Sequence, residues 1–132
     1  MNKKDSLESL PINYRNEKDF LLKNHLSSWE KLSNLSNYEI YEIIKNNPLC
    51  TESRLRKIKS IAKFIVHLQI PPHQAYLLLH CGISSFKALS TINPHNLEKK
   101  IGRLERNLRF NSKVSINLII VKEWIVKAQN LS

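Results

Sequence analysis

The amino-acid sequence predicts an all-α fold built from two copies of one helical unit. Apolar residues recur at helical spacing, and no segment alternates cleanly between apolar and polar residues as a half-buried strand would. Capping residues divide the chain into lengths that suit short helices. One motif also occurs twice, as LSSWEKLSNL from Leu26 and as GISSFKALSTI from Gly82. These observations together predict a tandem helical repeat.

The two copies of the motif align at a constant offset, in which Leu26 corresponds to Ile83 and Ser28 to Ser85. We call residues related by this offset equivalent. Upstream, FLLKNH from Phe20 resembles YLLLHC from Tyr76, and downstream residues 64–66 resemble residues 124–126. We therefore predict an internal duplication within a single compact domain, with units at residues 10–67 and 68–132. Residues 1–9 are expected to be disordered or loosely attached. The aromatic residues that recur with the copies are expected in the core: Trp29, Phe64, Phe86 and Trp124.

In the first copy, each predicted helix begins at a capping residue. Ser27 with Glu30, and Ser36 with Glu39, have the spacing of capping boxes. Further along, Pro48 ends one helix, and either Thr51 or Ser53 begins the next.

In the second copy, Asn93 followed by Pro94 is typical of an N-cap and the first helical position. Ser112 can cap the last helix. The longer helices are expected near residues 53–68, 93–108 and 112–129. The last of these is apolar over most of its circumference, which predicts a central position.

Two of the longer helices are expected to have an apolar face and a basic face. Around residues 93–108 the apolar positions are Leu97, Ile101, Leu104 and Leu108, and the basic ones are Lys99, Lys100, Arg103 and Arg106. Around residues 53–68 the apolar positions are Leu55, Ile58, Ala62 and Ile65, and the basic ones are Arg56, Lys59 and Lys63. A run of charge is most often just a solvated face. Here both copies gather several cations and few acids on one side, which favours a binding role.

The net charge is +10, from 21 Lys and Arg against 11 Asp and Glu. Such an excess indicates a polyanionic partner: nucleic acid, an anionic membrane surface or an acidic protein. The chain is also rich in Lys, Asn and Ile, whose codons are AT-rich, so codon bias is a second source of the charge. No apolar run approaches the roughly 18 residues of a membrane span, and the N-terminus lacks the apolar core of a signal peptide. A cytoplasmic or plastid stromal protein is expected.

The segment IPPHQAYLLLHCGISSFKALSTINPHNLEKKI, from Ile70 to Ile101, resembles a helix-hairpin-helix unit. Over residues 10–131 the tandem arrangement is similar to a domain of unknown function, common in cyanobacteria and some plastids, that contains paired helix-hairpin-helix units. It is more distantly similar to the C-terminal domain of the bacterial RNA polymerase alpha subunit. The resemblance implies a tandem helix-hairpin-helix fold. Because hairpins of this type bind nucleic acid, it also implies binding to nucleic acid.

The hairpin itself departs from the nucleic-acid-binding pattern. Such hairpins resemble P-G-I-G, whose glycines let successive backbone amides surround a phosphate. Here the residues read QIPP from Gln69, and the first copy reads PINY from Pro11. Pro71 and Pro72 have no N–H to donate and cannot adopt positive φ. This departure argues against duplex DNA binding through the hairpin.

A second candidate phosphate site lies where CGISS precedes a helix, at Gly82, Ser84 and Ser85. Free amides at a helix N-terminus favour an anion. Ser27 and Ser28 occupy the same place in the other copy. The alternative is that these serines only cap their own helices.

Catalytic, metal and cofactor chemistry is not expected. His73, His80 and Cys81 lack a further converging ligand for zinc. Cys50 and Cys81 are far apart and lack any metal-ligand spacing, so we expect small buried thiols, with a disulfide as the alternative. No P-loop or dinucleotide-binding motif is present.

Two functions therefore compete. The first is a non-enzymatic nucleic-acid-binding module that holds the phosphate backbone without sequence specificity through the seven basic residues above, for which DNA and RNA are both open. The second is a protein-interaction or assembly module whose basic face meets an acidic partner, for which a photosynthetic organism is one setting. The oligomeric state is open.

Overall fold

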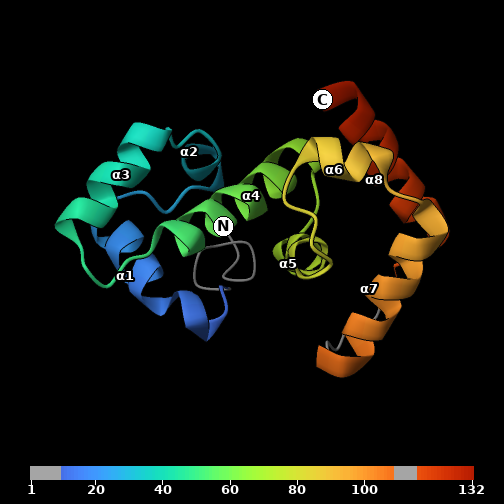
Figure 1. Ribbon diagram of the computed structural model, residues 1–132, viewed down its shortest axis with the longest axis horizontal. Coiled ribbons are helices and arrows are strands. Elements are labelled where there is room, and N and C mark those ends of the chain that lie inside the picture. Colours follow the sequence, from blue (N-terminus) through green and yellow to red (C-terminus); the bar gives the residue numbers. More distant parts are fainter. Residues whose placement is uncertain (1–9, 109–115) are drawn as a thin grey trace. The chain divides into compact units, whose positions relative to one another are not determined.

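The computed structural model describes residues 10–108 and 116–132, which contain eight α-helices, one 3-10 turn and no β-strand (Figure 1). The prediction of an all-α chain is confirmed. The chain divides into two compact units, one ending at Ala75 and the other running from Tyr76 to Ser132. Helix α5 (Pro72–His80) contains the point of division. The predictions for residues 1–9 and for Ser112 lie outside the described residues.

The first unit is organised around its long helix. It contains η3 (Ile12–Tyr14), α1 (Arg15–Lys23), α2 (Trp29–Ser33), α3 (Asn37–Asn46) and α4 (Glu52–Leu68). Helix α4, green in Figure 1, packs against both α2 and α3. Leu55, Ile58 and Ala62 on its inner face are fully buried, as the apolar spacing predicts, and Ile65 is half-buried. Burying such side chains contributes about 1.5–3 kcal/mol for each large aliphatic one.

The second unit has the same order of short and long helices. After α5 come α6 (Phe86–Thr91), α7 (Pro94–Leu108) and α8 (Leu118–Leu131), and α8 packs against α6 and α7. Leu97 and Ile101 on α7 are fully buried, and α8 buries Val121 and Trp124. The predicted central position of the last helix holds for one face only. Three large apolar side chains of α8 are exposed: Ile119, Val126 and Leu131.

The recurring aromatic residues lie largely in the core, as expected. Trp29 and Phe64 are buried in the first unit, and Trp124 is buried in the second. Phe86 is half-buried.

Of the two capping boxes predicted in the first unit, the structure contains one. The capping box at Ser36 is confirmed, because the Glu39 N–H donates to Ser36 Oγ and the Ser36 N–H donates to Glu39 Oε1, both over 3.1 Å. The capping box at Ser27 is wrong. Helix α2 begins one residue later than expected, with Trp29 buried in its first turn, so Ser28 is the cap and accepts from the Lys31 N–H.

Thr51, and not Ser53, caps α4 by accepting from the Arg54 N–H over 3.2 Å. In the second unit the predicted cap at Asn93 is confirmed, since Asn93 Oδ1 accepts from the Asn96 N–H over 3.1 Å. Helix α8 starts later than predicted. Its cap is Asn117, which accepts from the Ile120 N–H.

Equivalent turns end α1 and α5. The Leu26 N–H donates to Leu21 O over 2.8 Å, and the equivalent Ile83 N–H donates to Leu78 O over 3.1 Å. Such a bond from the second residue past the helix C-cap, with a left-handed residue before it, is a Schellman motif. Leu21 and Leu78 accept the equivalent bonds, so the structure makes these two residues equivalent. The alignment of FLLKNH with YLLLHC instead matches Leu21 to Leu77, and is therefore one residue out of register.

The left-handed residue differs between the two turns. His25 has φ 59° and Gly82 has φ 85°. Glycine adopts this conformation readily because it has no Cβ. A residue with a side chain adopts it at a cost of about 1 kcal/mol. The same turn is therefore more strained in the first unit.

Candidate functional site

Four exposed cations lie together on the outer side of α7: Lys99, Lys100, Arg103 and Arg106. We call them the α7 basic face. They lie opposite the buried Leu97 and Ile101, as the sequence pattern predicts. In the first unit Arg54 pairs with Glu17 and Arg56 with Glu52, but no described carboxylate forms an ion pair with a cation of this face. The α7 basic face therefore carries charge that no described carboxylate pairs with.

Arg106 folds back along its own helix. A Cβ added at Gly102 would lie 3.7 Å from Arg106 Nη1, which is an ordinary van der Waals distance. The guanidinium therefore lies alongside the preceding turn of α7, on the side where Gly102 has no side chain.

The turn that contains Gly82 lies near this face. Burial raises the pKa of the Cys81 thiol, and the Lys100 ammonium opposes that rise, which places Lys100 within electrostatic reach of Cys81. Gly82 supplies the left-handed residue of the turn. Ser85 Oγ accepts from the Ala88 N–H over 3.1 Å, so its hydroxyl caps α6. Ser84 is exposed and has a partner of its own.

The predicted basic residues of α4 form a different kind of surface. Arg56 Nη2 and Nε donate to Glu52 Oε1 over 2.8 and 3.1 Å, and Nη1 donates to Asn37 Oδ1 over 3.0 Å. Arg56 is therefore already engaged within the unit. Lys59 and Lys63 are half-buried, and we call the three residues the α4 ridge.

Positive charge accumulates on the α4 ridge. The pKa of Lys59 is lowered, first by burial and then by the Lys63 and Arg56 charges, while Glu39 acts in the opposite direction. A lowered lysine pKa means that the ammonium form is less favourable there than in water. An anion bound at this ridge would offset that penalty.

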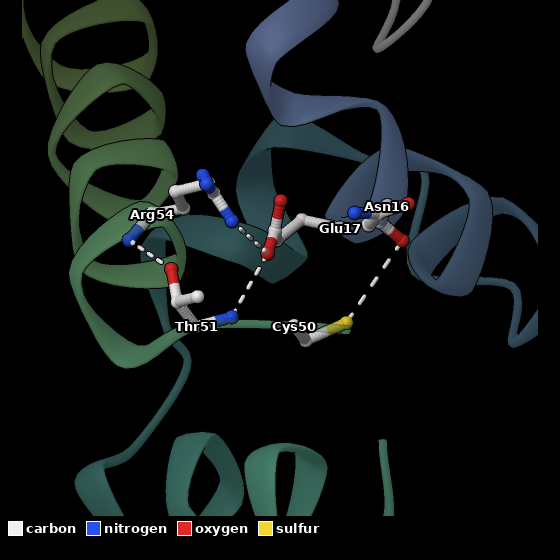
Figure 2. A network of polar contacts seen from close by, with 5 residues as sticks. All are labelled: Asn16, Glu17, Cys50, Thr51 and Arg54. Carbon is white, nitrogen blue, oxygen red and sulfur yellow. Dashed lines mark hydrogen bonds and ion pairs between the residues drawn. The ribbon is translucent and has the colours of Figure 1, made fainter. Parts of the chain in front are cut away.

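A buried carboxylate forms a cluster that the sequence did not reveal (Figure 2). Glu17 of α1 has 0% of its surface exposed. Its Oε2 accepts from the Thr51 N–H over 2.9 Å and lies 3.7 Å from Arg54 Nη1, as Figure 2 shows. Its Oε1 has no hydrogen-bond partner. The equivalent residue in the second copy is Gln74, a neutral amide, and this difference between the copies was the one available signal.

This cluster occupies the start of α4. A helix N-terminus carries about half a positive charge and free N–H groups, and so attracts anions. Here the Glu17 carboxylate already holds the N–H of the N-cap residue. A phosphate therefore cannot use that N–H unless it displaces a buried, ion-paired side chain.

The same surroundings suppress ionisation of two neighbouring groups. Burial raises the pKa of the Cys50 thiol, and the Glu17 charge adds to the effect. Burial likewise raises the pKa of Tyr14, with Arg54 opposing and Glu17 reinforcing the rise. Both groups are therefore neutral near pH 7. Cys50 and Cys81 are free thiols, as predicted.

Within the described part of the chain, no cluster of three or more His, Cys, Asp or Glu residues could hold a metal ion. None of the helices described there has the length and apolar character to cross a membrane.

Residues 12–131 match the family described as a domain of unknown function, DUF4332. The chain belongs to this family. The DUF4332 match covers both units, from η3 to the last residue of α8. It agrees with the expected resemblance to a domain of unknown function. No curated protein and no solved structure matches the chain.

Proposed function

We propose that this DUF4332 chain is a non-enzymatic module that binds the phosphate backbone of nucleic acid through the α7 basic face, without sequence specificity. The observation that carries the proposal is a row of four exposed cations that no described carboxylate neutralises. The second unit holds nine Lys and Arg against three acidic residues, so its charge is basic beyond this one helix.

The physical basis is electrostatic. Lys and Arg side chains that contact phosphates release condensed counterions, so such binding weakens steeply as salt rises. Contacts to phosphate carry no sequence information, and no element of the proposal requires a side chain to read a base edge. The turn at Gly82 belongs to the proposed phosphate site because the Lys100 charge acts on Cys81, the residue before Gly82.

We also propose that the two units arose by duplication of a helix-hairpin-helix unit. Support comes from matching features at equivalent positions. Leu32 and Leu89 are both fully buried. Ser33 Oγ donates to Glu30 O over 2.8 Å, and Ser90 Oγ donates to Lys87 O over 2.7 Å. The caps Ser28 and Ser85 are equivalent too, as are the two Schellman turns.

The proposal is tested by fluorescence anisotropy with labelled duplex and single-stranded oligonucleotides at about 50 and 200 mM salt. The variant Lys99→Gln/Arg103→Gln should weaken binding to every sequence alike and reduce the salt slope by about two. The matched control is Lys23→Gln/Lys45→Gln, which removes the same charge from exposed positions in the first unit. Absence of binding at the lower salt, or an equal loss in the control, would overturn the proposal.

The alternative is an acidic protein partner for the same basic face. The turn between α4 and α5 favours this protein partner over nucleic acid. Pro71 and Pro72 donate no N–H there, and the left-handed residue is Gln69, with φ 57°. A phosphate-binding hairpin would need free amides at this place. A pull-down after nuclease treatment that yields one stoichiometric acidic protein, lost in the Lys99→Gln/Arg103→Gln variant, would support this alternative.

A further inference from the structure

Two tyrosines are exposed side by side on α3. Tyr38 is 70% exposed and Tyr41 is 60% exposed. They are three residues apart, so their rings lie on neighbouring positions of one helix face. The inward side of α3 is supplied by Ile40 and Ile43, which are buried. The packing of α3 therefore does not require either aromatic ring.

The α4 ridge lies beside this face. Arg56 Nη1 donates to Asn37 Oδ1 over 3.0 Å, which joins the ridge to the first residue of α3. Tyr41 is four residues after Asn37 and so lies on the same side of α3 as that contact. We group the two tyrosines with the α4 ridge, which continues along α4 from that contact, and call the group the α3–α4 face.

Two of the three acidic groups near this surface are already engaged; the third, Glu42, is half-buried, lies four residues after Tyr38 and has no ion-pair partner among the described residues. Glu52 pairs with Arg56 over 2.8 Å. Glu39 accepts from the Ser36 N–H at the start of α3, and its charge reaches Lys59. Lys59 and Lys63 thus remain as the charges for an external anion. The pKa of Lys59 is lowered first by burial and then by the Lys63 and Arg56 charges.

We propose that the α3–α4 face binds single-stranded nucleic acid, with bases stacked on Tyr38 and Tyr41 and phosphates held by Lys59 and Lys63. Exposed aromatic rings beside a cationic groove or ridge are what sequence-tolerant binding of single strands requires. In a duplex the faces of the bases are stacked on one another and do not reach such rings. This inference rests on the proposed function and adds to it the preferred form of the nucleic acid.

The test compares two labelled strands of about 16 nucleotides with equal charge, one of thymidines and one of abasic sites. Anisotropy titrations at about 50 mM salt use the full chain and two double variants, Tyr38→Leu/Tyr41→Leu and Tyr38→Phe/Tyr41→Phe. The leucine variant removes the rings but keeps apolar side chains. The phenylalanine variant keeps the rings and serves as the matched control. Circular dichroism and thermal melting establish that each variant is folded.

The wild type should bind the thymidine strand at least about fivefold more tightly than the abasic strand. The leucine variant should lose this difference, and the phenylalanine variant should keep it. The double variant Lys59→Gln/Lys63→Gln should weaken binding to both strands, since it removes phosphate contacts and leaves the rings in place.

Equal affinity of the wild type for the two strands, or an unchanged preference in the leucine variant, would overturn the inference and leave the proposed function intact. Absence of binding to any strand or duplex at low salt would instead remove the proposed function, and the inference with it. If the tyrosine substitutions abolish capture of a protein partner and leave binding to the thymidine strand unchanged, the face is a protein-docking surface and the inference is wrong.

Discussion

Helices α3 and α7 follow the short second helix of their own unit, yet their outer faces carry different chemistry. Both bury an apolar residue at equivalent positions, Ile40 and Leu97. Outside, α3 presents two tyrosines, two carboxylates and one lysine, whereas α7 presents its four cations and has two half-buried carboxylates, Glu98 and Glu105. Packing constrains the inner residues, because a core tolerates little change in volume or polarity. The outer residues are free of that constraint, so the two units can share a fold and differ in what they bind.

The same contrast extends to the long helices. Helix α4 begins at a buried cluster in which Glu17 holds the Thr51 N–H and pairs with Arg54. Helix α8 begins at a neutral cap, Asn117. The first unit therefore uses an internal carboxylate to join α1 to α4. The second unit has the neutral Gln74 at the equivalent position and so lacks this carboxylate.

The largest expected effect comes from Glu17→Gln, which gives the first unit the amide found at the equivalent position, Gln74. Loss of the charge leaves Arg54 without its partner, and breaking a buried ion pair is costly. Because the Arg54 side chain is 39% exposed, water offsets part of the loss, and we expect a fall of about 2 kcal/mol in the free energy of unfolding. Urea denaturation measures it. The exposed Glu30→Gln is the control, and equal effects of the two changes would contradict the structural role of Glu17.

The next largest effect on stability distinguishes the Schellman turn at Gly82 from the one at His25. Gly82→Ala should destabilise by about 1 kcal/mol, because alanine incurs the cost of positive φ although the space around its Cβ is open. His25→Gly should stabilise by about 0.5 kcal/mol, because it removes the same strain. Thermal unfolding of both variants provides the comparison. If the two changes shift stability in the same direction, the two turns are not equivalent.

The last effect, also below about 1 kcal/mol by the usual cost of glycine in a helix, concerns Gly102, which lies in the interior of α7. Alanine there should stabilise the chain by about 0.8 kcal/mol, since glycine weakens a helix interior and the added Cβ meets only Arg106 Nη1 at 3.7 Å. Calorimetry measures the gain, and oligonucleotide titration checks function. Binding should be unchanged, because 3.7 Å is an ordinary contact distance that leaves Arg106 in place; a loss of nucleic-acid affinity in Gly102→Ala would contradict this expectation.

Several features of the fold could be predicted because they depend on neighbours in the chain. The capping box at Ser36 and the two-faced pattern of α7 involve residues three or four positions apart, and helical geometry brings such residues together. The error at Ser27 has a local cause as well. Two adjacent serines offer nearly equal caps, and the burial of Trp29 selects Ser28.

The rest required contacts that helical spacing does not encode. Glu17 and Thr51 are separated by 34 residues, and nothing in the local pattern marks that carboxylate as buried. Tyr38 and Tyr41 occur in an ordinary amphipathic helix, and exposure depends on which sides of α3 its neighbours cover. The same is true of Ile119 and Val126 on α8, whose apolar circumference predicts more burial than the helix achieves.

By itself, then, the sequence determined the helical class, the constant offset between the two motifs and the basic character of α7, since each follows from residue type and short-range periodicity. The pair between Arg56 and Glu52 follows from helical spacing within α4. Only the tertiary structure decided that Arg54 of α4 pairs with Glu17 of α1, and that the α7 basic face has no carboxylate partner among the described residues. The physical reason is that pairing requires two side chains within a few ångströms, a distance that packing sets and composition does not.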